Sequence, residues 1–367
     1  MPYPLNLTRR DFLKAGFLTG GLAAAAGAAG VAGRDLPFGQ PPPPTATPHN
    51  HVGHGGMGTV GQVDSARNGF DPMALLQDWD FGVVSTLPNG QTLREFRIYA
   101  IDKEIEVAPG VFFPGWVYNG RVPGPTLRCT EGDRVRIEFA NGSSHPHTMH
   151  FHGIHSARMD GVPHVGAGMI EPGNSTVYEF DAFPFGCHLY HCHATPLKRH
   201  IHKGLYGAFI IDPDPARHPE DRQAASSRLY GTPENQAVNE MIMVMNAFDT
   251  NFDGENEVYA VNSIAFAYMN TPIPIRPDQR QRLYLVNLTE FDPINSIHLH
   301  ANFFDYFDHG TTLTPTLRTV DTIMQCQAQR GILEFSYEGF EDGLYMFHAH
   351  QSEFAELGWM GFFEVKA

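Results

Sequence analysis

Polar and apolar residues alternate along short segments through most of the chain, a pattern that predicts β-strands. Residues 134–139 read Arg-Val-Arg-Ile-Glu-Phe and residues 176–180 read Thr-Val-Tyr-Glu-Phe. A period of two buries one face of a strand and leaves the other in water. Gly132 and Asn141-Gly142 bound the first segment as turn residues. Because no amphipathic helix pattern occurs between residues 90 and 213, we expect an all-β domain of sandwich or barrel type.

The second half of the chain repeats the first, with corresponding segments roughly 150 residues apart. The matched pairs are residues 136–141 with 282–287, His150-Phe151-His152 with His298-Leu299-His300, His191-Cys192-His193 with His348-Ala349-His350, and residues 204–209 with 358–363. We therefore expect two copies of one β domain, at residues 91–213 and 238–367. Residues 214–237 between them are polar and rich in Pro, Asp and Ser, as is typical of an interdomain linker.

Two segments of the second domain imitate metal sites but are better explained by the fold. The segment Met241–Met245 alternates methionine with other apolar residues, which predicts sheet core rather than a copper-binding box. Residues 249–254 imitate the start of a calcium loop, but Ala260 stands at the twelfth position, where a bidentate Glu is needed. A hairpin turn is expected there instead.

The N-terminus carries a predicted export signal. Arg9-Arg10, with Phe12 and Lys14, forms a twin-arginine (Tat) pattern, and an apolar run rich in Ala and Gly follows to about residue 33. The alternative is an N-terminal membrane anchor. The run is short for a span and no stop-transfer charges follow it, so we predict a signal peptide at residues 1–34 and no stable membrane insertion. The mature protein would then be periplasmic or extracellular.

Residues 35–90 form a Pro/Gly/His-rich segment that we expect to have little regular structure up to about residue 80. Within it, His49, His51, His54 and Met57 either bind copper, which suits imidazole and thioether ligands, or belong to a solvated tail.

Composition narrows the chemistry. The formal net charge of −15 argues against a nucleic-acid partner, which requires a basic surface. Twenty histidines against four cysteines exclude a disulfide-rich scaffold and point to imidazole chemistry. Cys129 and Cys187 either pair in an oxidising compartment or stay as thiols, and Cys326 would be a free, buried thiol.

Eight histidines form four His-x-His pairs, two in each repeat and at matched positions: His150/His152, His191/His193, His298/His300 and His348/His350. On a strand, residues two apart point to the same face, so each pair projects together. Eight imidazoles that converge at one interface could hold three metal ions.

A second site is predicted on the opposite face of these strands. Cys192 points away from its flanking histidines, and His147, three residues before His150, points away from that pair. A thiolate and an imidazole need a second imidazole and a weak axial group to form a blue-copper site. The repeat alignment offers His200, with His202 as the competitor, and places Leu205 in the axial position. The second repeat has no thiolate and no imidazole at the corresponding positions, so it cannot form such a site. The residues there are Asn295, Ala349, Phe354 and Trp359.

At these residues the sequence resembles the multicopper oxidases. His147-x-x-His150-x-His152-Gly153 resembles a copper-binding motif of that family, and His191-Cys192-His193 matches its His-Cys-His signature. The resemblance covers residues from about 90 to 367. It is closest to two-domain, laccase-like multicopper blue proteins that keep type 1 copper only in the first domain. The loop between Cys192 and His200 is longer than is usual in that family, which leaves the choice between His200 and His202 open.

The resemblance implies an all-β fold of two tandem cupredoxin-like (Greek-key β-sandwich or barrel) domains and four copper ions per chain. Type 1 copper would be bound by His147, Cys192 and His200, with Leu205 axial. Type 2 copper would be bound by His150 and His298, and the type 3 pair by His152, His191, His193, His300, His348 and His350. Family members assemble as homotrimers with each cluster between subunits. A domain that presents four histidines outward cannot complete three metal sites alone, which favours the same head-to-tail ring.

The implied activity is the one-electron oxidation of a donor at type 1 copper, coupled to the four-electron reduction of dioxygen to water at the cluster. Cys192 and its flanking peptide bonds would connect the two sites. Asp160 resembles the acid that family members place after the His-x-His-Gly motif, although Asp160-Gly161 is also a common turn. Glu353 and Glu356 are further proton-path candidates, and both could be solvated surface residues.

Two other functions stay open. A copper-containing nitrite reductase shares the two-domain trimer, but its family places an Asp within the first motif and does not need His152, His193, His300 or His350. A non-catalytic copper-binding or copper-tolerance protein is motivated by the segment from His49 to Met57. The electron donor could be a phenol, a cuprous or manganous ion, or a small redox protein.

Overall fold

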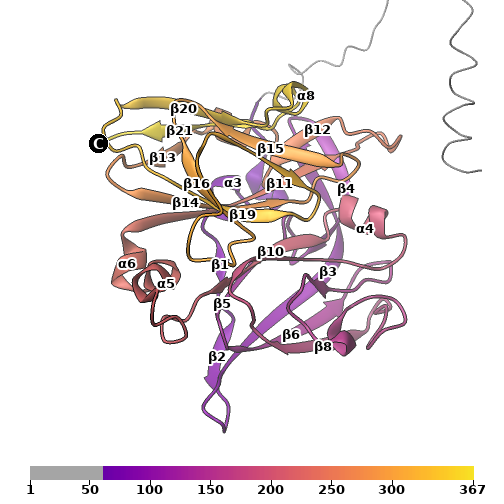
Figure 1. Ribbon diagram of the computed structural model, residues 1–367. Coiled ribbons are helices and arrows are strands. Elements are labelled where there is room, and N and C mark those ends of the chain that lie inside the picture. Colours follow the sequence, from indigo (N-terminus) through magenta and orange to yellow (C-terminus); the bar gives the residue numbers. More distant parts are fainter. Residues whose placement is uncertain (1–60) are drawn as a thin grey trace, which may run out of the picture. The chain divides into compact units, whose positions relative to one another are not determined.

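The computed structural model describes residues 61–367. The predicted signal peptide and the segment from His49 to Met57 lie outside the described residues. Strands dominate the described chain and form four sheets, two from residues 79–212 and two from residues 238–365 (Figure 1). The prediction of an all-β protein with two tandem domains is confirmed.

The first domain packs a sheet in the order β2-β3-β6-β8, extended by β4 at β3, against a sheet in the order β1-β5-β10-β9-β7. The segments predicted at 134–139 and 176–180 are β6 and β8, which pair antiparallel. The strands are β1 (Trp79–Asp80), β2 (Val83–Thr86), β3 (Thr92–Ala108), β4 (Val111–Tyr118), β5 (Thr126–Thr130), β6 (Arg134–Asn141), β7 (His150–Phe151), β8 (Ser175–Asp181), β9 (Gly186–His191) and β10 (Tyr206–Asp212).

The second domain repeats this pairing in sheets ordered β12-β11-β14-β19-β16-β17 and β13-β21-β20-β15-β18. In both domains a long strand runs parallel to its neighbour, which then pairs antiparallel (β3-β6-β8 and β11-β14-β19). The strands are β11 (Val238–Phe248), β12 (Val258–Val261), β13 (Ile273–Ile275), β14 (Arg280–Asn287), β15 (Ile294–Leu299), β16 (Phe304–Asp308), β17 (Leu317–Val320), β18 (Thr322–Cys326), β19 (Arg330–Phe335), β20 (Gly343–His348) and β21 (Met360–Val365).

The helices of the described residues are all short. They are α2 (Ser65–Asn68), α3 (Pro72–Leu75), the 3₁₀ helix η1 (Ala157–Met159), α4 (Leu197–His202), α5 (Arg222–Arg228), α6 (Pro233–Gln236), α7 (Ala267–Asn270) and α8 (Ser352–Glu356). Within residues 61–367 none of them has the length and apolar character that a membrane crossing requires.

Three segments are more regular than the sequence pattern predicts. Residues 65–80 were expected to have little regular structure, and this expectation is wrong. The side chain of Asn68 bonds both backbone groups of Glu106 on β3, and Leu75 and Leu76 are buried, so tertiary contacts order α2 and α3. The polar stretch 214–237 contains α5 and α6. The segment after Cys192 contains α4, where no helix was expected.

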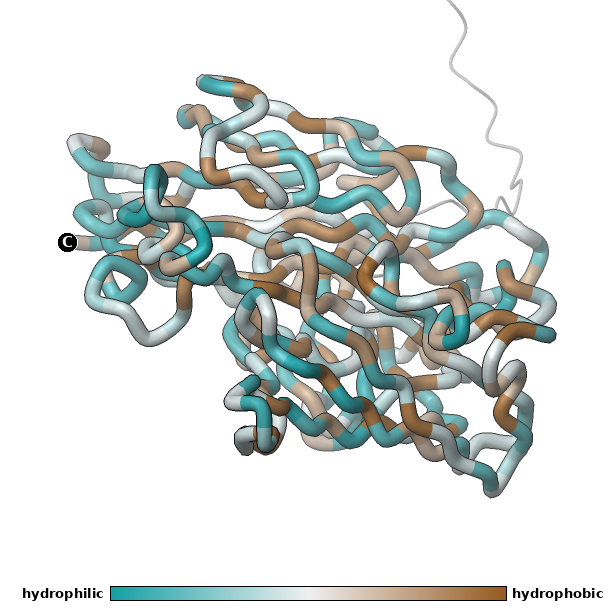
Figure 2. Tube along the Cα trace, turned by 60° about the horizontal axis from the view of Figure 1, so that its bottom comes forward, coloured by the Kyte–Doolittle hydropathy of each residue, from teal (hydrophilic) through white to brown (hydrophobic). Residues whose placement is uncertain are grey.

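Alternating residues supply the core. Figure 2 shows hydrophobic and hydrophilic residues alternating along many strands. Each domain has its own buried cluster, and Met241, Met243 and Met245 lie in that of the second domain, as predicted for sheet core. A third cluster spans both domains and includes Ile105 and Phe113 of the first and Phe248 of the second. The two domains therefore share a core, which fixes one against the other.

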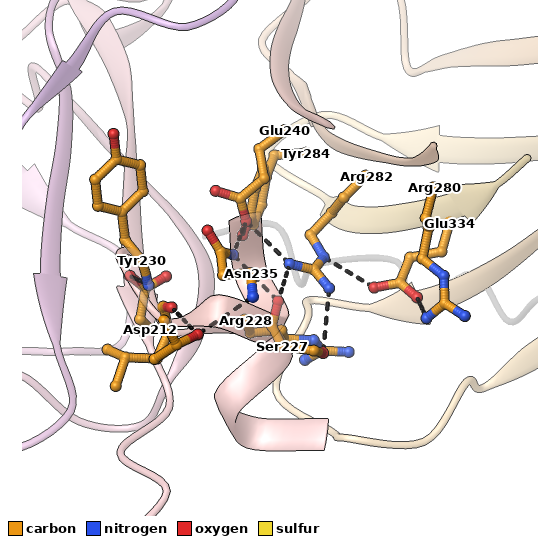
Figure 3. Close-up of polar contacts among 12 residues, drawn as sticks. Asp212, Ser227, Arg228, Tyr230, Asn235, Glu240, Arg280, Arg282, Tyr284 and Glu334 are labelled. Atoms are coloured by element: carbon orange, nitrogen blue, oxygen red, sulfur yellow. Dashed lines mark hydrogen bonds and ion pairs between the residues drawn. The ribbon is translucent and has the colours of Figure 1, made fainter. Parts of the chain in front are cut away.

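A buried ionic network also joins the domains. Arg128 on β5 bonds Asp212 on β10 at 2.9 Å and Glu240 on β11 at 2.6 Å. Glu240 also bonds Arg282 on β14 at 3.0 Å, and Arg282 bonds Glu334 at 2.8 Å (Figure 3). The two arginines outweigh the effect of burial and lower the pKa of Glu240, so this carboxylate stays ionised.

The cysteines do not form the considered disulfide. Cys129 and Cys187 are free and buried on strands that flank β10, where they align with Ile211 and Ile210 respectively. Neighbouring residues of a strand point to opposite faces, so the two thiols lie on opposite faces of the sheet. Cys326 is also free, but it is exposed rather than buried as expected.

Candidate copper centres

One thiol and two imidazoles converge inside the first domain. His147, Cys192 and His200 each offer one ligand atom, and these atoms lie within 4.8 Å of one another. The Nδ1 atoms of His147 and His200 are 3.9 Å and 3.3 Å from Cys192 Sγ. All three residues are buried. The sulfur accepts a 3.3 Å hydrogen bond from the backbone N–H of Thr148.

Local structure explains this convergence. Cys192 directly follows β9, and its N–H donates to the carbonyl of Leu205, which precedes β10. His147 is held by two backbone hydrogen bonds to Ile170. Helix α4 bridges the gap between Cys192 and Leu205 and carries His200 into the domain. The longer loop thus contains a helix rather than displacing the imidazole.

His202 lies elsewhere. Its Nε2 accepts a 3.0 Å hydrogen bond from the N–H of Asp249, and its ring contacts Phe113 and Phe291. Of the two histidines that the sequence left open, only His200 faces the thiol. The Asp249 loop is the hairpin connection between β11 and β12, as predicted.

A second group of imidazoles lies on the other side of the same strands. His150 pairs with His191 across β7 and β9, and His152 Nε2 is 2.8 Å from His191 Nε2. His193 completes the group, with its ring centroid 5.4 Å from that of His150. The alternation of faces predicted for His191, Cys192 and His193 is therefore confirmed.

The second domain builds the same group with the same register. His298 pairs with His348 across β15 and β20, and His300 Nε2 is 3.0 Å from His348 Nε2. The ring of His350 lies 5.4 Å from that of His298. Ala349 is buried where Cys192 lies in the first domain, and the indole of Trp359 bonds Asn295 at 3.1 Å. The second domain thus keeps the imidazole group and lacks the thiol cluster.

Backbone contacts fix which ring nitrogen is free. His191 Nδ1 is 2.8 Å from the carbonyl of Cys192, and His348 Nδ1 is 2.6 Å from the carbonyl of Ala349. A carbonyl can only accept, so each Nδ1 donates and each neutral ring keeps its Nε2 lone pair for a metal. The Nε2 atom of His152 faces that of His191, and the Nε2 atom of His300 faces that of His348.

Models of the multicopper oxidase family match residues 102–216 and 232–367. A crystal structure of a multicopper oxidase is 52% identical and covers 83% of this chain and 100% of that chain, with a TM-score of 0.76. The chain belongs to the multicopper oxidase family. The blue copper oxidase of Nitrosomonas europaea is also similar, at 26% identity over 74% of this chain and 86% of that chain, with a TM-score of 0.60.

The match to nitrite reductases is more limited. The copper-containing nitrite reductase of Neisseria meningitidis serogroup A is 32% identical over 119 residues, which are 32% of this chain and 30% of that protein. The matched segment therefore spans less than a third of that relative. The cupredoxin-like architecture expected for both tandem domains agrees with the multicopper oxidase match.

The donor set fits copper. Soft thiolate and imidazole ligands suit that metal in the first group, and imidazoles suit it in the other two. Burial lowers the pKa of His147, His152 and His191 to about 3 and that of His200 to about 4, so these rings are neutral at neutral pH, as metal ligation requires. The buried Nδ1 of His193 has no hydrogen-bond partner within the described chain.

Asp160 lies beside the first imidazole group. Its Oδ1 is 2.9 Å from His150 Nδ1 and 3.5 Å from His155 Nε2. The turn explanation also holds, because Gly161 has φ +68° and a Cβ there would collide with the carbonyl of Met149. The two explanations are compatible, since the turn brings the carboxylate to His150.

Glu353 and Glu356 lie on α8 and are exposed. Neither side chain makes a hydrogen bond to either imidazole group in the described residues, so their role in a proton path stays a prediction.

Several neighbours of the candidate centres carried no recognisable sequence signal. Asp321 places its backbone oxygen 3.0 Å and its Oδ2 3.8 Å from His298 Nδ1, which parallels Asp160 at His150. The ring of Trp116 lies 5.3 Å from that of His147 and 4.8 Å from that of His200. These contacts join segments that are far apart in the sequence, so no local motif predicts them.

Proposed function

We propose that the protein is a laccase-like multicopper oxidase that couples one-electron oxidation of a donor to reduction of dioxygen to water. His147, Cys192 and His200 would hold type 1 copper, with Leu205 in the axial position. The carrying observation is that His191-Cys192-His193 places its thiol in one group of candidate metal ligands and its imidazoles in another. Copper bound at these groups would supply the one-electron transfer and the four-electron reduction of dioxygen.

The protein's own residues connect the two centres. A few covalent bonds of the backbone separate the sulfur of Cys192 from the rings of His191 and His193. This covalent connection gives electron transfer a short path through the strand. The carboxylate of Asp160, whose Oδ1 lies 2.9 Å from His150 Nδ1, is the group we propose to hold a proton close to the site of dioxygen reduction.

We propose that the imidazole groups of two different subunits together form the trinuclear site. Within the described residues, no group of possible ligands combines histidines from both domains. His150 and His298 would bind type 2 copper, and the other six would bind the type 3 pair. Four copper ions per chain would then require the first domain of one subunit to face the second domain of the next.

The shapes and surfaces of the two groups support a homotrimeric ring. His150, His152, His191 and His193 line a cavity of about 250 Å³. The second-domain group instead lies on the outer face of the β15-β20 sheet, where Ile294, Met324 and Leu344 are also exposed. An exposed apolar face that carries half of a metal site is suited to a second copy of the chain.

Copper content separates this function from its nearest alternative. An oxidase with a type 1 ion and a trinuclear cluster should contain about four copper ions per chain. A nitrite reductase with one type 1 and one type 2 ion should contain about two. Inductively coupled plasma measurements on the copper-loaded oligomer, with its mass from light scattering, decide between them. About two ions per chain would contradict the proposal, and so would a stable four-copper monomer.

Dioxygen uptake separates the enzyme from a copper-storage protein. A storage or tolerance protein would take up copper without consuming dioxygen when a phenolic donor is added.

We also propose export by the twin-arginine route to the periplasm or the extracellular space. Replacement of Arg9-Arg10 by Lys-Lys should leave the protein in the cytoplasm, as cell fractionation would show.

A further inference from the structure

A chain of two hydrogen bonds connects the surface residue Asp102 to the buried imidazole of His147. Asp102 Oδ1 accepts a 2.7 Å hydrogen bond from Ser143 Oγ. Ser143 Oγ lies 2.9 Å from His147 Nε2. Because the hydroxyl proton of Ser143 is directed to the carboxylate, Ser143 can only accept from His147. His147 is therefore the Nε2–H tautomer, and its Nδ1 lone pair faces the thiol group.

The backbone holds this chain in place. The N–H of Ser143 bonds Asn141 Oδ1 at 3.0 Å, and the N–H of Ser144 bonds Asp102 Oδ2 at 2.9 Å. Both carboxylate oxygens of Asp102 thus have defined donors. Partial burial raises the pKa of Asp102, but the hydrogen bonds from Ser143 and Ser144 outweigh it and hold the pKa below its ordinary value. The side chain is consequently a carboxylate at neutral pH.

The second domain provides an internal comparison. Ala100 aligns with Asn141 across β3 and β6, and Met245 aligns with Asn287 across β11 and β14. Two residues further on each strand stand Asp102 in the first domain and Ala247 in the second.

The hydroxyl contact itself recurs in the second domain. Asn295 Nδ2 donates to Thr289 Oγ1 at 2.8 Å, as His147 Nε2 does to Ser143. The hydroxyl is thus part of the shared scaffold and is present with or without a thiol site. The carboxylate occurs only in the domain that has the thiol.

We propose that Asp102 is a positioning residue that acts through Ser143 on His147 and thereby tunes the type 1 copper site. This inference rests on the proposed function, because it requires copper at His147, Cys192 and His200. A carboxylate connected to a ligand imidazole orients the ring and makes it a stronger donor. The added negative charge favours the cupric over the cuprous state and lowers the reduction potential.

The reduction potential of the type 1 copper, followed by its blue absorption band, tests this role. In copper-loaded Asp102→Asn, the blue band should persist while the ratio of cuprous to cupric ion at a fixed poise rises about tenfold, which is about 59 mV for one electron. Ser143→Ala should shift the potential in the same direction. Because both act along one path, the double variant should shift it no further than the larger single change.

Two matched variants separate the hydrogen-bonded path from general effects. Glu104 lies two residues beyond Asp102 on the same face of β3, where it pairs with Arg67 in solvent. Glu104→Gln removes an equal charge and should leave the potential unchanged. Ser143→Thr restores the hydroxyl in the form that the second domain uses, and it should restore the wild-type potential.

An unchanged potential in Asp102→Asn with an intact blue band would overturn the role of Asp102 but not the proposed function. A shift of equal size in Glu104→Gln would overturn it as well, since any surface charge would then suffice. If Asp102→Asn does not fold, the comparison of Ser143→Ala with Ser143→Thr decides, and equal potentials in these two would overturn the role. Absence of a blue band from copper-loaded wild-type protein would instead overturn the proposed function, and the role of Asp102 with it.

Discussion

At the scale of single residues, Trp116 packs against both imidazoles of the cluster that His147, Cys192 and His200 form. Its ring packs against His147 and His200, and against His145 at 4.4 Å, while the guanidinium of Arg199 covers it at 5.2 Å. The side chain is buried. Trp116 therefore holds both imidazoles in position and separates them from solvent.

Trp116→Ala should lower the free energy of unfolding by about 3–5 kcal/mol, because a large buried side chain leaves a cavity. It should also broaden the blue absorption band, since both ligand rings lose a packing partner. Trp116→Phe keeps most of the contact and should retain the band. Denaturant unfolding and visible spectroscopy measure both effects. A Trp116→Ala variant with wild-type stability and spectrum would contradict the packing role.

Asp160 has a separate prediction. If its carboxylate delivers protons, Asp160→Asn should slow dioxygen turnover by a factor of about 10²–10⁴ and leave copper content and the blue band unchanged. If Asp160 only forms the turn before Gly161, the Asn variant should keep its turnover, because Asn also suits turns. Steady-state oxygen uptake, with copper content as the control, distinguishes the two.

At the scale of elements, the sequence predicted the faces of the strands well and their long-range partners poorly. The shared face of each His-x-His pair was predicted correctly, because side chains on a strand alternate strictly. Cys192 therefore points away from the face that His191 occupies. His200 could not be separated from His202, because the decision depends on α4, whose six residues carry no distinct helical pattern. The contact of Asp102 with Ser143 depends on the parallel register of β3 and β6 and leaves no local signal.

The ionic network between the domains is likewise a product of register, and it gives a prediction for the strands it joins. Glu240→Ala would leave Arg128 and Arg282 buried with one partner fewer each. Breaking a buried pair in this way should destabilise the protein by about 3–5 kcal/mol. The exposed pair of Arg97 and Glu138 is the control, and Glu138→Ala should cost less than about 1 kcal/mol. Equal losses in chemical denaturation would contradict the importance of burial.

At the scale of the whole molecule, the buried neutral histidines predict sensitivity to acid. Burial lowers the pKa of His188 to about 4, and those of His147, His152 and His191 to about 3. In the unfolded chain these rings bind protons below about pH 6.5, whereas the folded protein excludes them. The metal-free protein should therefore lose stability as pH falls from about 7 to 4.

Equilibrium unfolding at several pH values measures this loss. The copper-loaded protein should lose more, because protonation of the ligands also releases the metal. A metal-free protein whose unfolding free energy is constant between pH 7 and 4 would contradict the buried, neutral state of these rings.

In the function that we propose, Cys192 connects electron entry in the first domain to dioxygen reduction at the shared imidazole groups. Oxygen consumption by the copper-loaded protein, measured against a panel of phenolic, metal-ion and protein donors, tests it most directly. We expect oxygen uptake by the wild-type protein with at least one donor, and loss of nearly all uptake in Cys192→Ser at unchanged fold. Full activity in Cys192→Ser, or no uptake by the wild type with any donor, would contradict it.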